Sequence, residues 1–105
     1  MIKIESIIEG IKTKKIRITD HADEEAYSDR LSFKEILASI STGEIIEQYP
    51  DDKPYPSCLI FSKNFRDEPI HSVWAYNQNT QSSVLITVYR PDPKQWIDGK
   101  VRRKP

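Results

Sequence analysis

The amino-acid sequence predicts an α+β fold in which helices pack on one face of a mainly antiparallel sheet of four to five strands. Apolar residues recur at helical spacing up to Gly43 and at every second position after it, so a helical half precedes a strand-rich half. A length of 105 residues is typical of one compact domain. We therefore expect a single domain with an N-terminal helix over 1–14, an α+β core over 15–90 and a basic C-terminal tail over 91–105.

The helical half begins with four isoleucines that share one face of a short docked helix: Ile4, Ile7, Ile8 and Ile11. Residues 15–19 then alternate polar and apolar side chains, which predicts an edge strand whose lysine and arginine discourage pairing with other molecules. Asp20 is the expected N-cap of a helix over 21–30, because its carboxylate can accept hydrogen bonds from the free N–H groups of the first turn.

The next helix has the clearest boundaries. Ser32 and Glu35 stand at the spacing of a capping box, and Gly43 is placed to end the helix in a left-handed conformation. The buried stripe of this helix is expected to be Phe33, Ile36, Leu37 and Ile40. Strand-like periodicity follows over four segments: 44–49, 57–62, 70–77 and 83–90.

The last two strands are expected to form a hairpin with a turn centred on Asn79 and Thr80. The expected pairs are Val73 with Ile86, Ala75 with Val84, and Trp74 with Leu85. Since small aliphatic side chains suit a surface that helices cover, we expect the helices to cover the face that holds His71, Val73 and Ala75. The opposite face would then expose Ser72, Trp74, Tyr76, Leu85, Thr87 and Tyr89.

The composition excludes several classes of protein. The hydrophobic fraction of 37% and the charged fraction of 30% are ordinary for a globular chain, and no apolar run suits a membrane span. Glu5 and Glu9 interrupt the first isoleucines, unlike the apolar centre of a secretory signal, so we expect a cytoplasmic protein. Cys58 is the single cysteine, and it and two histidines lie at scattered positions, so we expect no internal disulfide, no metal site and no cofactor.

The charges balance over the whole chain but are unevenly distributed along it. Residues 1–19 carry a net charge of +3, residues 20–55 carry −7, and residues 90–105 carry +4. Such blocks are compatible with an ordinary solvated surface. They are also compatible with a basic tail that meets phosphates or an acidic partner.

Several short motifs occur in a characteristic order. They are His21-Ala22, Arg30, the segment Ser-Thr-Gly-Glu-Ile-Ile-Glu at 41–47, Ile70-His71-Ser-Val73, and the segment Thr-Val-Tyr-Arg-Pro-Asp-Pro-Lys-Gln-Trp at 87–96. In this order, over about residues 16–104, the chain resembles the domain of unknown function 4258 family. Glu25 departs from that family, which commonly has arginine four residues after the histidine.

The resemblance carries implications for fold and function. The family is similar in element order to RelE/ParE-like toxins of bacterial toxin–antitoxin modules, which implies a RelE-like fold. Some of those toxins cleave mRNA on the ribosome. By analogy, the resemblance implies a toxin-like domain that interacts with RNA. The implied activity is that of a metal-independent endoribonuclease, and the implied partner is a small antitoxin-like protein.

Cleavage of RNA through the 2′-hydroxyl group needs a base, an acid and positive charge on the phosphate. The candidate catalytic residues are His21, His71 and Arg90, which would have to share one cleft. In the alternative structural roles, His21 hydrogen-bonds across a strand–helix junction, and His71 is a core residue with satisfied hydrogen bonds.

The candidate RNA-binding residues are cations and aromatic side chains. Guanidinium groups suit phosphates, and aromatic rings stack on unpaired bases. The candidates are Arg30, Trp74, Tyr76, Tyr89, Lys100, Arg102 and Arg103. In the alternative, the cations are solvated and the rings pack beneath the tail or against a partner.

The second candidate function is a non-catalytic protein-interaction module. Its basis is the contrast between the acidic block over 20–55 and the basic tail, because complementary patches steer association. The partner would be an acidic protein or the acidic block of another copy, and the sequence leaves the oligomeric state open.

Overall fold

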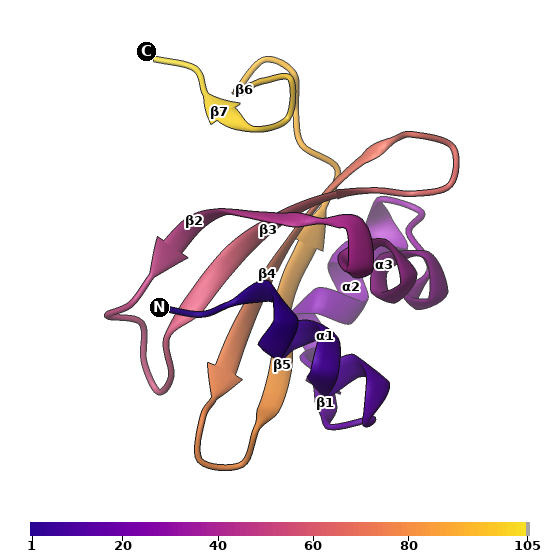
Figure 1. Cartoon of the computed structure of the whole chain (residues 1–105). Helices are drawn as coiled ribbons and strands as arrows, with labels where there is room; N and C mark the ends of the chain where they lie inside the picture. Colours follow the sequence, from indigo (N-terminus) through magenta and orange to yellow (C-terminus); the bar gives the residue numbers. More distant parts are fainter. Residues whose placement is uncertain (105) are drawn as a thin grey trace.

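The computed structural model describes residues 1–104 as three α-helices and a mixed five-stranded sheet (Figure 1). The elements are α1 Ile4–Lys12, β1 Ile16–Ile18, α2 Asp20–Ser28, α3 Phe33–Ser39, the 3-10 turn η1 Ile40–Thr42, β2 Glu44–Tyr49, β3 Ser57–Lys63, β4 Pro69–Asn77, β5 Ser82–Tyr89, β6 Trp96–Ile97 and β7 Val101–Arg102. The sheet order is β1-β5-β4-β3-β2, where β1 runs parallel to β5 and the other pairs are antiparallel. The predicted α+β class is confirmed. Within the described part of the chain, no helix has the length and hydrophobicity that a membrane crossing requires.

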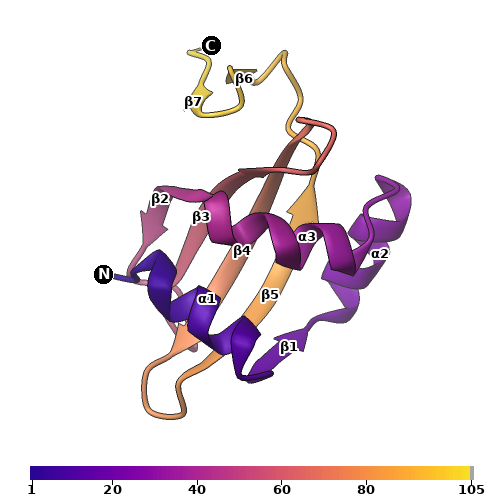
Figure 2. The same cartoon turned by 45° about the vertical axis from the view of Figure 1, so that its right-hand side comes forward.

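The hydrophobic core lies between the helices and one face of the sheet, and Figure 2 shows α1 and α3 in front of that face. The fully buried side chains of this core come from both layers and include Ile7, Ile36, Ile40, Ile60, Trp74 and Leu85. Cys58 lies among them, and burial raises the pKa of its thiol to about 12. It is therefore an unreactive core residue.

The N-cap of α2 is Thr19, and the prediction of Asp20 was wrong by one residue. The Thr19 hydroxyl accepts a hydrogen bond from the Ala22 N–H at 3.0 Å and donates to the Ile86 carbonyl at 2.8 Å. A hydroxyl can donate and accept at once, whereas a carboxylate only accepts. Thr19 therefore begins the helix and ties it to β5 at the same time.

The predicted capping box of α3 is confirmed, but the predicted role of Gly43 is not. Ser32 accepts from the Glu35 N–H at 3.1 Å, and the Glu35 carboxylate accepts from the Ser32 N–H at 2.9 Å. Gly43 has a φ of −82°, so it is not left-handed, because the 3-10 turn η1 ends the helix before it. A Cβ atom at Gly43 would lie 2.9 Å from the Phe61 carbonyl oxygen, so a glycine is needed there for space.

The helices cover the opposite face of the β4–β5 hairpin from the one predicted. Trp74 pairs with Leu85, as expected, but both are fully buried toward the helices. The Trp74 indole finds its polar partner inside the core, where its N–H donates to the Ser72 hydroxyl at 3.0 Å. Burying this large ring contributes more than burying small aliphatic residues such as Ala75, which explains the choice of face.

A bulge in β5 also changes the predicted register. Val73 pairs with Thr87, not with Ile86, so Ile86 is the extra residue and the side-chain alternation shifts after it. Thr87 and Tyr89 consequently join His71 on the face away from the helices. We call this side of the sheet the uncovered face.

The basic tail folds back as a small hairpin of β6 and β7, which the sequence did not predict as strands. Both views show it at the end of the sheet where β5 ends (Figures 1 and 2). Trp96 is 4% exposed and packs edge-on against His71, with ring centroids 4.5 Å apart. The prediction that Trp96 anchors the tail on the body is therefore confirmed.

Candidate functional site

His71 lies at the centre of the contacts between the tail hairpin and the uncovered face. Its Nε2 donates to the Gly99 carbonyl oxygen at 2.5 Å, and its Nδ1 accepts from the Tyr89 hydroxyl at 3.1 Å. The carbonyl can only accept, which fixes the proton of the neutral ring on Nε2. The His71 side chain is fully buried, and this burial lowers its pKa. His71 is therefore a neutral residue with satisfied hydrogen bonds beneath the hairpin.

An ion pair joins the hairpin to the edge strand β2 beside His71. The Arg102 Nε and Nη2 donate to the two oxygens of Glu47 at 2.8 and 3.1 Å, and Tyr49 donates its hydroxyl to the same carboxylate. The hydrogen bonds from Arg102 lower the pKa of Glu47, whereas burial raises the pKa of Tyr49 to about 12. The Arg102 guanidinium also lies 4.6 Å from the centroid of the Trp96 ring.

We call this set the hairpin cluster: Glu47, Tyr49, His71, Tyr89, Trp96 and Arg102. General acids and bases work best when their pKa is close to the ambient pH. Here the carboxyl pKa moves down, the His71 pKa moves down and both tyrosine pKa values move up, so each group is held in one protonation state near neutral pH. These shifts suit a set of groups that holds the hairpin in place better than one that transfers protons.

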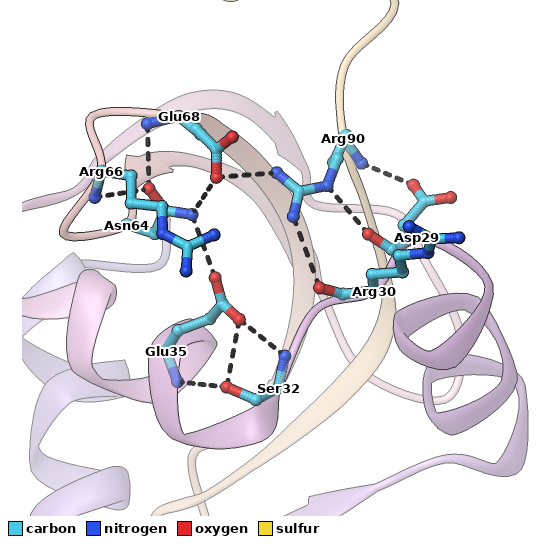
Figure 3. Close-up of polar contacts among 8 residues, drawn as sticks. All are labelled: Asp29, Arg30, Ser32, Glu35, Asn64, Arg66, Glu68 and Arg90. Carbon is cyan, nitrogen blue, oxygen red and sulfur yellow. Dashed lines mark hydrogen bonds and ion pairs between the residues drawn. The ribbon is translucent and has the colours of Figure 1, made fainter.

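Arg90 lies in a second polar cluster, in which it joins three segments of the chain (Figure 3). Its backbone N–H donates to the Asp29 carboxylate and its Nε donates to the Asp29 carbonyl, both at 2.8 Å. Its two terminal nitrogens reach the Glu68 carboxylate and the Arg30 carbonyl, each at 3.4 Å. Arg90 therefore fixes the α2–α3 and β3–β4 turns to the end of β5.

Asn64 completes what we call the Arg90 network, namely Asp29, Arg30, Ser32, Glu35, Asn64, Arg66, Glu68 and Arg90 (Figure 3). Its amide nitrogen donates to Glu35 at 3.0 Å and to Glu68 at 2.8 Å. Its amide oxygen accepts from the backbone N–H groups of Arg66 and Glu68, both at 2.9 Å. No sequence motif marks Asn64, because its partners come from two separate segments.

The three predicted catalytic residues lie in different surroundings. His21 is exposed on the first turn of α2, His71 is buried under the hairpin, and Arg90 belongs to the network at the α2–α3 turn. Over residues 1–104, no hydrogen bond joins any two of them. Hydrogen bonds within the described residues therefore do not join these three side chains, and a cleft shared by His21, His71 and Arg90 stays a prediction.

Most of the predicted RNA-binding residues already have partners within the chain. Trp74 is fully buried, Tyr76 is half-buried on the helix side and Tyr89 is bonded to His71. Among the tail cations, Lys100 pairs with Glu44 at 2.6 Å, Arg102 pairs with Glu47, and the Arg103 Nε donates to the Pro93 carbonyl at 2.8 Å. Arg30 is exposed and makes no ion pair within the described residues.

A groove that the sequence analysis missed lies at the other end of the sheet from the hairpin. It has a volume of about 480 Å³, and its lining includes Lys14, Lys15, Arg17, Tyr55, Asn77, Thr80 and Ser82. No carboxylate of the described chain lines it, and its three cations make no ion pair there. We call it the cationic groove. The net charge of +3 over residues 1–19 was the signal that could have revealed it.

The cationic groove opens on the same side of the sheet as the hairpin cluster. Arg17 pairs with Val84, and Val84 pairs with Ala75, so these side chains share a face with His71. Ala75 and His71 are four residues apart on β4, which corresponds to about 13 Å along the strand. The uncovered face therefore carries unpaired positive charge at one end and a docked hairpin at the other.

These features define the class of protein as a small α+β domain with one mixed sheet, whose uncovered face combines a cationic groove with a docked C-terminal hairpin. The model of the family described as Domain of unknown function (DUF4258) matches residues 18–90, more than half of the 105 residues. The chain belongs to this family. Comparisons with curated proteins and with solved structures found no match. The matched range contains the Arg90 network, whereas the groove cations and the tail hairpin flank it.

Proposed function

We propose that this chain is a toxin-like domain with a RelE-like fold that binds RNA through the uncovered face of its sheet. The observation that carries this proposal is the cationic groove, where Lys14, Lys15 and Arg17 meet without a carboxylate partner. Lysine and arginine contacts with phosphates supply most of the affinity of non-specific nucleic-acid binding. The tail cations are a weaker candidate because Lys100 and Arg102 are already paired.

The same geometry favours binding without cleavage. A ribonuclease needs an accessible base and acid, but His71 is fully buried and Arg90 is bonded to three other residues. Opening the hairpin to expose His71 would also remove Arg102, the guanidinium that lies beside it. The endoribonuclease function therefore has the weaker support.

Charge reversal at the groove tests the proposal. Arg17→Glu is compared with Lys34→Glu, which makes the same charge change at an exposed site on α3. Affinity for a labelled single-stranded RNA of about 12 nucleotides is measured by fluorescence anisotropy over a range of salt concentrations. We expect Arg17→Glu to weaken binding and to lower the slope of log affinity against log salt by about one, with little change for Lys34→Glu.

Two results would count against the proposal. One is an equal loss of affinity in both variants, and the other is no measurable binding by the unmodified protein at low salt. Gel analysis of the same RNA after incubation separates binding from cleavage. Intact RNA is expected, and cleavage that persists in His71→Gln would show that a ribonuclease site lies elsewhere on the domain.

The protein-interaction function is favoured by a different observation. Tyr27 on α2 and Phe65 in the β3–β4 turn are 86% and 85% exposed, and aromatic residues are frequent among the residues that dominate protein interfaces. Under the toxin-like function proposed above, the partner that we propose for these side chains is a small antitoxin-like protein. Co-expression with the product of the adjacent gene tests it, since Tyr27→Ser with Phe65→Ser should abolish co-purification.

A further inference from the structure

We infer that the cationic groove holds one nucleotide of a single-stranded RNA, with its base stacked on Tyr55 and its flanking phosphates on Lys14, Lys15 and Arg17. This goes beyond general affinity for RNA, while resting on the RNA-binding function proposed above. Nothing in the motifs of the sequence marks Tyr55, because it lies in the loop between β2 and β3.

The cationic wall of the groove is held in place by backbone hydrogen bonds. Lys14 has a left-handed φ of 61°, and its N–H donates to the Ile11 carbonyl at 3.2 Å. The Lys15 N–H donates to the Gly10 carbonyl at 2.8 Å, and the Lys15 carbonyl accepts from the Ser83 N–H at 3.0 Å. The turn between α1 and β1 is therefore fixed, and only the long side chains have to be ordered by a phosphate.

The aromatic wall is also attached to the sheet. Pro56, next to Tyr55, accepts at its carbonyl from the Tyr76 N–H at 3.1 Å, and Ser57, the first residue of β3, donates its hydroxyl to Asp52 in the loop. Tyr55 nevertheless keeps 37% of its surface exposed. The backbone next to Tyr55 is therefore attached to the sheet, and the ring keeps the accessible surface that base stacking requires. The Asp52 carboxylate is engaged by Ser57, and it does not line the groove.

The polar side of the groove offers little discrimination between bases. The Asn77 amide oxygen is used by the turn, since it accepts from the Asn79 N–H at 3.0 Å and the Thr80 N–H at 3.4 Å. The Thr80 and Ser82 hydroxyls bond each other at 2.6 Å. The donors left for a ligand in this part of the groove are the Asn77 amide nitrogen and the O–H of whichever hydroxyl accepts in the Thr80–Ser82 pair. Stacking and charge therefore dominate, which is typical of sites that tolerate many sequences.

The dimensions of the groove separate single strands from duplexes. A volume of about 480 Å³ lies in the range of sites that enclose one small ligand. In a duplex the bases are stacked and paired, so none can enter a groove beside a tyrosine ring. Duplex RNA can use the lysines and the arginine, but it cannot use Tyr55.

Substitution of Tyr55 tests the inference separately from the charge contacts. Tyr55→Leu is compared with Tyr55→Phe, which keeps the ring, and with Tyr27→Leu, which removes an exposed tyrosine on α2. We expect Tyr55→Leu to weaken single-stranded RNA binding about tenfold without changing the salt slope, whereas Tyr55→Phe and Tyr27→Leu bind normally. Duplex RNA of the same length should bind Tyr55→Leu as it binds the unmodified protein. Thermal melts establish that each variant is folded.

The outcomes distinguish the two proposals. If Tyr55→Leu binds single strands normally while Arg17→Glu still weakens binding, RNA binding stands and the stacking inference is wrong. If the unmodified protein binds no RNA, the proposed function fails. The groove is then tested alone by measuring the changes in amide NMR chemical shifts when adenosine monophosphate or inorganic phosphate is added. Shifts near Tyr55 with the nucleotide but not with phosphate would support base stacking in the groove, and equal shifts with both would overturn it.

Discussion

Asn64 illustrates how a single polar side chain organises a turn. It is 8% exposed, and its amide makes four hydrogen bonds to Glu35, Arg66 and Glu68. These bonds hold the β3–β4 turn against α3, in the region that Arg90 ties to α2. Buried amide groups are costly to leave without partners, so the network depends on this residue.

Asn64→Ala should destabilise the protein by about 1–3 kcal/mol, because the Arg66 and Glu68 N–H groups lose their acceptor. Asn79→Ala is the matched control, since Asn79 is exposed in the β4–β5 turn and should change stability by less than about 0.5 kcal/mol. Urea unfolding measures both free energies. Equal midpoints for the two variants would mean that the Asn64 hydrogen bonds contribute nothing net.

His71 gives the protein a dependence of stability on pH. Burial holds its folded-state pKa below the ordinary value of 6.5, so the unfolded chain binds more protons between these two values. The free energy of unfolding should therefore be highest above 6.5 and should fall as the pH drops through 6.5 toward the folded-state pKa. The carboxyl groups with lowered pKa, such as Glu47, lose their contribution only at lower pH.

His71→Gln should flatten this pH dependence between about pH 7.5 and about pH 5.5, because an amide N–H can still donate to Gly99 but does not titrate. Urea unfolding at several pH values provides the measurement. Parallel curves for the variant and the unmodified protein would show that His71 is not the titrating group.

The sequence could identify His71 as an important residue but not its role. Histidine stands out by its rarity in this chain, yet its partners Tyr89 and Gly99 are 18 and 28 residues away. Whether these partners leave it free or enclose it depends on the path of the tail. Periodicity carries no information about that path, and the same applies to the groove formed by Arg17 and Tyr55.

At the scale of elements, the periodicity of apolar residues predicted the helices and the strands of the main sheet. It failed for the orientation of β4 and β5, because alternation defines two faces without saying which one the helices cover. Burial of the Trp74 ring decided which face the helices cover. Because of the bulge at Ile86, Tyr89 lies on the face opposite Trp74, away from the helices. The β6–β7 hairpin was missed because strands of two residues leave no periodic pattern.

The turn of the tail hairpin contains two adjacent residues with left-handed backbone, Asp98 with a φ of 52° and Gly99 with a φ of 74°. Gly99→Ala should destabilise the docked hairpin by about 1–3 kcal/mol, because of the strained backbone and a Cβ placed 2.7 Å from the Phe61 ring. Asp98→Gly is the control in the same turn and should cost nothing. Urea unfolding measures both variants.

Tryptophan emission gives a second measurement of the same pair. Trp74 is buried in the core, so a red shift in Gly99→Ala would report exposure of Trp96 as the hairpin leaves His71. Unchanged emission and stability in this variant would show that the contact between Gly99 and Phe61 is not needed for docking.

At the scale of the whole molecule, the uneven charge distribution is partly offset by ion pairs within one chain. Glu44 and Glu47 belong to the acidic block, and they pair with Lys100 and Arg102 of the basic tail. The same complementarity had suggested association between copies. Pairing within the chain offsets part of the charge that would drive this association, including two of the tail cations.

Sedimentation should consequently give the mass of one chain at both about 50 mM and about 500 mM salt. The charge-reversed variant Arg102→Glu leaves Glu47 without its partner and is the informative comparison, because it could associate at low salt. Dimers of the unmodified protein that dissociate at high salt would contradict the expectation.

The parallel pairing of β1 with β5 also affects how the protein can be made. Thr19 bonds to Ile86 across 67 residues of chain, and β1 has no other strand beside it. A nascent polypeptide leaves the translation machinery from its N-terminus, so β1 emerges long before β5 exists. Residues 1–19 therefore remain without their strand partner until most of the polypeptide has been synthesised.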